Sequence, residues 1–73
     1  MKHVNLILAC NIQAYRRKKG WSQAGLAMRI GVTPQAVSKW ECGKCAPDIS
    51  LLPTLASVFG CQIDELFLWE RQE

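Results

Sequence analysis

The chain has 73 residues, 49% of them apolar, and a formal net charge of +3 at neutral pH. This length allows one domain, expected over residues 1–73. A chain this short buries roughly 60% of its unfolded surface, so it is marginal but can fold alone. Its apolar content excludes a disordered tail. No stretch approaches the ~20 apolar residues of a membrane helix, and the apolar run before Cys10 is too short for a secretory signal. We therefore expect a cytoplasmic protein without a membrane partner.

The charges are divided unequally along the chain. Residues 1–40 contain seven bases and no acid, whereas residues 41–73 contain two bases and six acids. A basic half suits a polyanion such as nucleic acid, and a solvated charged surface is the alternative interpretation.

Five short helices are predicted along the chain, and no strand pattern is present. Apolar residues that recur three and four positions apart place the helices at 5–18, 23–30, 34–42, 51–59 and 63–68. The expected N-caps are Asn5, Ser22, Thr33 and Ser50. The predicted core contains Leu8, Ile12, Tyr15, Leu26, Ala27, Ile30, Val37, Trp40, Leu52, Leu55, Ala56, Phe59, Ile63 and Leu66. This pattern predicts a compact all-α five-helix bundle.

The segment 23–41 has the pattern of a helix-turn-helix. Gly31 stands between its two helices, where a helix that ends sharply needs a residue tolerant of positive φ. Thr33 offers an N-cap oxygen to the second helix, and Pro34 suits the first helical position, which needs no N–H. Such a unit presents its second helix to the major groove of DNA.

Four cysteines, Cys10, Cys42, Cys45 and Cys61, leave both disulfides and a zinc site open. Cys42-Gly-Lys-Cys45 has zinc-knuckle spacing, but a strong zinc signal needs a second close pair, which the sequence lacks. We expect reduced thiols, with Cys10 and Cys61 as small buried hydrophobes and Cys42 and Cys45 in a loop. A regulatory Cys42–Cys45 disulfide is the alternative. No metal or other cofactor is expected.

A set of residues in fixed order extends this interpretation from about Leu8 to Phe67. They are Arg16, Gly20-Trp21-Ser22-Gln23, Leu26-Ala27, Ile30-Gly31-Val32-Thr33, Val37-Ser38-Lys39-Trp40-Glu41-Cys42-Gly43-Lys44, Pro47, Leu55-Ala56, Phe59-Gly60-Cys61 and Asp64-Glu65-Leu66. In this order and spacing the chain resembles the Cro/phage-repressor (XRE-type) helix-turn-helix family. The resemblance implies a lambda-repressor-like fold and a sequence-specific, double-stranded-DNA-binding transcriptional regulator, with a repressor favoured.

The resemblance also implies which residues meet the bases. Those that match by position are Thr33, Pro34, Gln35 and Lys39, with Thr33 at the groove edge. Gln35 can form two hydrogen bonds with adenine, and Lys39 can donate to guanine. Cys42 differs from the family, which commonly has Asn or Arg at this position.

The phosphate contacts are expected at the start of the second helix and near its neighbours. Ser22 and Gln23 stand at the amino end of that helix, where a side chain and free N–H groups can meet one phosphate. Further candidates for phosphate contacts are Arg17, Ser38 and Lys44.

Arg16 and Glu41 match an ion pair of the family that links the first helix to the end of the third. Two unrelated surface charges are the alternative. The pair would hold the recognition helix on the scaffold. Trp21 and Trp40 are interpreted as core residues rather than as stacking platforms for nucleic acid.

A homodimer on a two-fold operator is favoured, because one such domain makes too few base contacts for high specificity. The alternative function is a protein-interaction module, such as an antitoxin that neutralises a partner protein and binds DNA secondarily. An enzyme is not expected. The only histidine is His3, and no nucleophile–base pair or carboxylate pair stands in a recognisable motif, so no catalytic residue is assigned.

Overall fold

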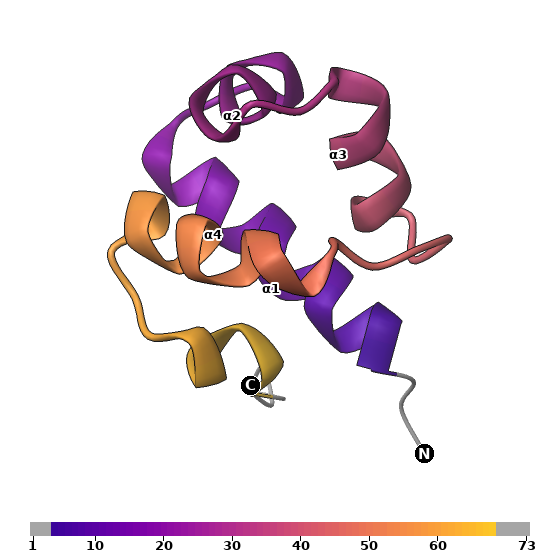
Figure 1. Ribbon diagram of the computed structural model, residues 1–73, viewed down its shortest axis with the longest axis vertical. Coiled ribbons are helices and arrows are strands. Elements are labelled where there is room, and N and C mark those ends of the chain that lie inside the picture. Colours follow the sequence, from indigo (N-terminus) through magenta and orange to yellow (C-terminus); the bar gives the residue numbers. More distant parts are fainter. Residues whose placement is uncertain (1–3, 69–73) are drawn as a thin grey trace.

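Four α-helices and two 3-10 helices form the regular structure of the computed structural model, which describes residues 4–68 (Figure 1). In chain order they are α1 (Val4–Lys19), α2 (Gln23–Ile30), α3 (Pro34–Glu41), η1 (Ile49–Leu51), α4 (Leu52–Phe59) and η2 (Ile63–Phe67). No strand occurs among the described residues, which confirms the predicted all-α class. No helix within residues 4–68 is long and apolar enough to cross a membrane.

The end of the predicted bundle differs from the structure. The segment expected as a fifth α-helix at 63–68 is the 3-10 helix η2, and Leu68 after it is extended (φ −76°, ψ 130°). Five residues offer too few i→i+4 hydrogen bonds to favour an α-helix over the tighter form. The helix predicted at 34–42 also ends one residue early, with Cys42 as its C-cap.

Asp48, and not Ser50, caps the segment before α4. Its carboxylate accepts the backbone N–H of Ser50 at 3.3 Å and also the hydroxyl of that residue. One turn of 3-10 helix therefore precedes α4, in whose first turn Pro53 needs no N–H. The predicted N-cap Asn5 lies inside α1, which extends one residue beyond the predicted 5–18 at each end.

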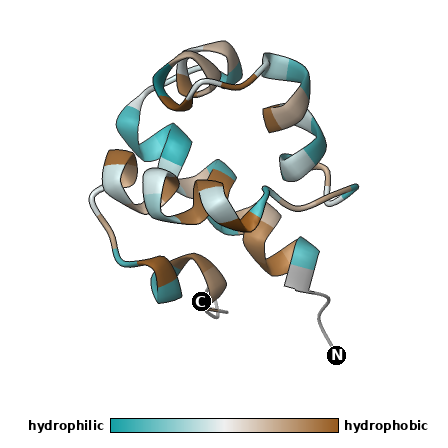
Figure 2. Cartoon of the chain, in the orientation of Figure 1, coloured by the Kyte–Doolittle hydropathy of each residue, from teal (hydrophilic) through white to brown (hydrophobic). Residues whose placement is uncertain are grey.

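One cluster of buried side chains joins the four α-helices and η2. Its members are Leu8, Ile12, Leu26, Ala27, Ile30, Val37, Trp40, Leu55, Ala56, Phe59 and Leu66, all of them predicted core residues. Figure 2 shows apolar residues recurring along α1 and α4 and a hydrophilic stretch at the carboxyl end of α1. Helical spacing predicts that Ile63 faces the core, but this residue is 41% exposed, because η2 winds with three residues per turn rather than 3.6.

Asn11 of α1 fastens η2 to the bundle. Its Nδ2 donates to the carbonyl oxygens of Leu66 (2.7 Å) and Leu68 (2.9 Å). At the other end of η2, the carboxylate of Glu65 accepts the N–H of Gln62 (2.7 Å). These bonds hold the short helix in the register that buries Leu66 completely.

The turn between α2 and α3 depends on the left-handed backbone of Gly31, whose φ is 77°. Its N–H and that of Val32 both donate to the carbonyl oxygen of Ala27, at 2.9 and 3.0 Å. A Cβ atom added at Gly31 would meet nothing within 4 Å, so only the backbone conformation opposes a side chain here. The angle between the two helices is therefore set by one glycine.

Replacement of Gly31 by alanine should lower the free energy of unfolding by about 1–2 kcal/mol, because the left-handed conformation crowds a Cβ atom. Gly31→Asn is the matched control and should cost less, since asparagine tolerates this conformation better than alanine. Urea denaturation of both variants measures the difference. An alanine variant as stable as the asparagine variant would contradict this explanation of the turn.

Candidate nucleic-acid interface

Two capped helix starts position the residues predicted to touch DNA. At the start of α2, Ser22 Oγ accepts the N–H of Gly25 (2.9 Å), and at the start of α3, Thr33 Oγ1 accepts the N–H of Ala36 (3.2 Å). Both predicted N-caps are thereby confirmed. Each hydroxyl serves as an acceptor in its cap, so its O–H can still donate to a phosphate.

The helix α3 has one buried side and one exposed side. Val37 (0% exposed) and Trp40 (5% exposed) lie in the core, which confirms the interpretation of Trp40 as a core residue. The side chains predicted to read bases are all exposed; they are Thr33, Pro34, Gln35 and Lys39. Ser38 is half-buried between the two sides. All four predicted base-reading residues are therefore exposed, and Gln35 and Lys39, four positions apart, share one side of α3.

Apart from Ser38, which lies on α3 itself, the residues predicted to touch phosphates come from three segments: the end of α1, the start of α2 and the turn after α3. Arg17 lies in the last turn of α1, Ser22 caps α2 and Lys44 follows the end of α3, and all three are exposed. Gln23 is half-buried, and its Nε2 donates to Glu41 Oε1 at 3.1 Å. An amide has a second N–H, so Gln23 can hold Glu41 and still reach a phosphate.

Arg16 and Glu41 form the predicted ion pair between α1 and the end of α3. Arg16 Nε donates to Glu41 Oε2 at 2.6 Å, and Nη2 donates to Oε1 at 3.0 Å, a two-point contact. The two side chains are 11% and 2% exposed, respectively. The remaining nitrogen, Nη1, donates to the carbonyl oxygen of Trp21 at 2.8 Å. Arg16 therefore also fixes the junction between α1 and α2.

Two glutamines complete the surroundings of Glu41. Besides Gln23 at 3.1 Å, Gln13 of α1 donates from Nε2 to Glu41 Oε1 at 3.4 Å. Sequence reasoning missed Gln13. The available signal was its position three residues before Arg16, which places both side chains on one side of α1.

The hydrogen bonds to Glu41 keep its carboxyl group ionised. Burial acts to raise the pKa of Glu41, but the bonds from Arg16, Gln23 and Gln13 outweigh burial and hold that pKa below its ordinary value. The same hydrogen bond raises the pKa of Arg16. Both partners are therefore charged at neutral pH, and the contact between α1 and α3 stays ionic.

Trp21 covers the junction that Arg16 fixes. Its ring stacks on that of Phe59, with centroids 6.4 Å apart, and the guanidinium of Arg29 lies 4.2 Å from the centroid of the Trp21 ring. The side chain is half-buried and packs against the core cluster, so it is not presented as an open stacking platform.

One cysteine prediction was wrong. Cys10 is exposed, because it lies two residues from both Leu8 and Ile12, which face the core. Cys61 is half-buried, and burial raises the pKa of its thiol. Its side chain packs against the core as a small hydrophobe, as predicted.

Cys42 and Cys45 are exposed in the turn that follows α3, where the sequence placed them. Within residues 4–68, no group of three or more His, Cys, Asp and Glu side chains is arranged to hold a metal ion. His3 lies outside the described residues.

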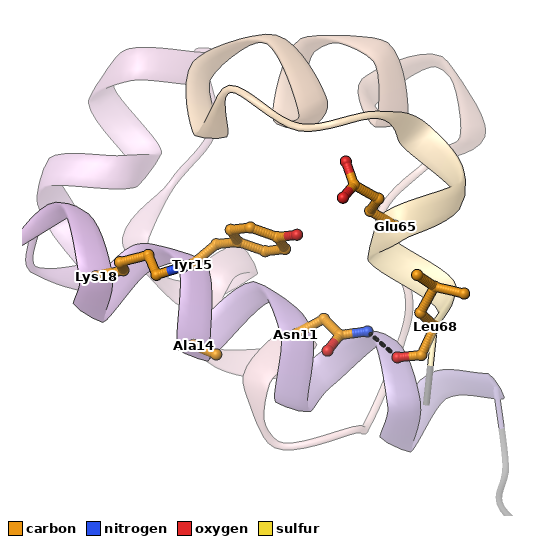
Figure 3. A pocket seen from close by; sticks show the side chains of 6 residues that line it. All are labelled: Asn11, Ala14, Tyr15, Lys18, Glu65 and Leu68. Atoms are coloured by element: carbon orange, nitrogen blue, oxygen red, sulfur yellow. Dashed lines mark hydrogen bonds between the residues drawn. The ribbon is translucent and has the colours of Figure 1, made fainter. Parts of the chain in front are cut away.

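A cavity of about 310 Å³ lies between α1 and η2 (Figure 3). Its lining residues are Asn11, Ala14, Tyr15, Lys18, Glu65 and Leu68. The residues predicted to touch DNA are not among them. The candidate interface is accordingly an exposed surface built from α2, α3 and the turn after α3, outside this cavity.

A family model described as helix-turn-helix matches residues 12–66, which include α2, α3 and the buried ion pair. The chain belongs to the helix-turn-helix family. A relative from Archaeoglobus fulgidus, an uncharacterised HTH-type transcriptional regulator, is 34% identical over 62 residues, which cover 85% of this chain and 89% of the relative. The resemblance to this family that the sequence suggested is thereby confirmed.

Two solved structures show that other helix-turn-helix proteins share the fold. The hypothetical transcription factor NHTF from Neisseria superposes with a TM-score of 0.83 at 30% identity, over 90% of this chain and 76% of that chain. The P22 c2 repressor, crystallised with the synthetic operator 9T, superposes with a TM-score of 0.78 at 32% identity, over 82% of this chain and 91% of that chain. The lambda-repressor-like fold class is thus confirmed.

Removal of one member of the ion pair should be costly. Arg16→Met leaves a buried carboxylate without its cation and should lower the free energy of unfolding by about 3–5 kcal/mol. The double variant Arg16→Met/Glu41→Leu should lose less than the sum of the single variants, because neither charge is then left alone. Denaturant melts of the single and double variants measure these losses in the free energy of unfolding. Strictly additive losses would contradict the ion pair, and Arg17→Met, at an exposed neighbour, is the control.

The lowered pKa of Glu41 predicts an acid-sensitive fold. A carboxyl group whose pKa is lower in the folded state stabilises that state above its unfolded pKa, close to 4.5, and this stability is lost as the pH falls through the lower folded value. The stability advantage of the wild type over Glu41→Gln should therefore shrink between pH 7 and pH values below 4.5. Denaturant melts across this range test it. An advantage that stays constant or grows on acidification would show that Glu41 is not ionised in the fold.

Proposed function

We propose that this chain is a sequence-specific transcriptional regulator that binds double-stranded DNA as a homodimer and reads the major groove with α3. The observation that carries the proposal is the exposed row of Thr33, Pro34, Gln35 and Lys39 on a helix whose other side is fixed by the core. Membership of the helix-turn-helix family supports it, as does the operator complex of the P22 c2 repressor. The protein acts in the cytoplasm by binding alone, without a catalytic step.

The chemistry of the exposed row suits base edges. The amide of Gln35 can donate to adenine N7 and accept from adenine N6, which distinguishes adenine from the other bases. The ammonium of Lys39, one turn further along α3, can donate to guanine O6 and N7. Pro34 offers an apolar contact of the kind that a thymine methyl group accepts.

The surroundings of α3 suit the DNA backbone. Ser22 and Gln23 lie at the amino end of α2, where free N–H groups and the helix dipole favour a phosphate. Arg17 and Lys44 add exposed positive charges, and the first forty residues contain no acid that would oppose them. Contacts of this kind fix the register of α3 in the groove without reading sequence.

An apolar surface on η2 supports self-association. Ile63, Phe67 and Leu68 are 41, 38 and 50% exposed within six consecutive residues. A second copy could cover them in a two-fold dimer, and dimers of this class bind half-sites about 34 Å apart. The same surface favours the second candidate function, an interaction module that binds a different protein and uses DNA secondarily.

Selection from random duplex DNA tests the proposal. The wild type should enrich a palindromic sequence, because two copies related by a two-fold axis read the two strands alike. A single unrepeated half-site would remove the homodimer from the proposal. The absence of any enriched sequence would favour the interaction module.

Variants of α3 place the readout on individual residues. Gln35→Ala and Lys39→Ala should each relax the preference at one base position, at a cost of about 1–3 kcal/mol. Arg17→Ala is the control and should weaken binding to all sequences alike, since a phosphate contact carries no base preference. Full retention of base preference by Gln35→Ala would contradict the placement of α3 in the groove.

A further inference from the structure

Two exposed thiols, Cys42 and Cys45, lie on the turn that ends α3. Cys42 is the C-cap, and Gly43 after it has a left-handed backbone with φ 75°. The N–H of Gly43 donates to the carbonyl oxygen of Trp40 (3.1 Å), and that of Lys44 donates to the carbonyl oxygen of Lys39 (3.0 Å). The backbone therefore folds back at the end of α3, and Cys45 directly follows this turn, three residues after Cys42.

The backbone that carries these thiols is held in place on both sides of Cys42. Glu41, immediately before it, is fixed by Arg16. Gly43, immediately after it, lies against α1 so closely that an added Cβ atom would be 2.8 Å from Leu6 Cδ2. A ligand at the thiols thus meets a turn whose position is already set, while the sulfur atoms remain exposed to solvent.

The donor set determines which ligand fits. Residues 4–68 offer no third His, Cys, Asp or Glu that would close a metal site with these two thiols, and a structural zinc ion takes four ligands. Two thiolates are soft donors and suit Cu(I) and ions like it. Lys44, between the two cysteines in the sequence, supplies a positive charge next to them.

We propose that Cys42 and Cys45 form a two-coordinate site for a soft monovalent cation of the Cu(I) class. On binding, both S–H bonds break, two protons leave to solvent and two metal–sulfur bonds form, without any change of oxidation state. Two neutral thiols and one cation of charge +1 thereby become a complex of charge −1. The added negative charge offsets that of Lys44.

Metal binding at this turn would also regulate DNA binding, and this effect rests on the proposed function. Cys42 follows Ser38 and Lys39 by four and three residues, one turn further along α3. The anionic complex therefore forms at the end of the surface that is proposed to face the phosphates. Metal loading should weaken DNA binding by removing one effective positive charge.

Silver(I) is the probe, because it has the charge and softness of Cu(I) and no oxidation step under these conditions. Native mass spectrometry in the presence of a competing monothiol counts the ions bound per chain. The wild type and Cys10→Ser should retain one silver ion, and Cys42→Ser and Cys45→Ser should retain none. Cys10 is the matched control, since it is exposed and has no partner cysteine close in sequence. Equal loss in all three variants, or retention by Cys42→Ser, would overturn the site.

The effect on DNA is measured separately. One silver ion per wild-type chain should make the slope of log K against log salt shallower by about 0.9, the contribution of one phosphate contact. Cys45→Ser should keep its slope. An unchanged wild-type slope would overturn the regulatory effect and leave the site intact. A chain that binds silver in the expected pattern and no DNA at all would overturn the proposed function alone.

Oxidation is the competing outcome at the same residues. A loss of two hydrogens per chain on handling in air would show that the pair forms a disulfide. If reduced chains also fail to bind silver, the metal site is excluded. Reduced chains that bind one silver ion support the metal site, because thiols persist in the reducing conditions of the cytoplasm.

Discussion

The carboxylate of Glu41 determines how α3 lies on the rest of the molecule. It accepts hydrogen bonds from Arg16 and Gln13 of α1 and from Gln23 at the start of α2, and its side chain is only 2% exposed. Burial of apolar side chains such as Val37 is not directional, so it allows α3 to rotate or slide by small amounts. A buried charge that loses its partners costs several kcal/mol, and it is satisfied in one arrangement only.

This constraint connects the fold to the proposed contact with DNA. Gln23 donates to Glu41 and also stands at the amino end of α2, so the residue that orients α3 lies next to an expected phosphate. Gly31 sets the angle between α2 and α3, and Glu41 sets the position of the far end of α3. The exposed side of α3 is thereby presented before DNA arrives, which lowers the entropy cost of binding.

Much of the fold could be predicted because its signals are local. The caps Ser22 and Thr33 and the turn at Gly31 each depend on residues at most four positions away. Elements whose form depends on their length or on distant partners could not be predicted in this way. The residues of η2 have helical spacing but are too few for an α-helix, and Asn11, 55 residues before Leu66, holds them. For the interface, exposure of Gln35 and Lys39 followed from the burial of Val37 and Trp40, whereas Gln13 and the bond of Gln23 to Glu41 required the positions of three helices.

Backbone amide shifts of the free and DNA-bound protein, measured residue by residue with a duplex obtained by selection, test most directly whether α3 is the reading element. We expect the largest changes at 33–39 and at Ser22 and Gln23, with smaller changes in α4 and η2. Changes concentrated at 63–68 with α3 unaffected would contradict it, because DNA would then contact η2 and not the helix that Glu41 holds in place.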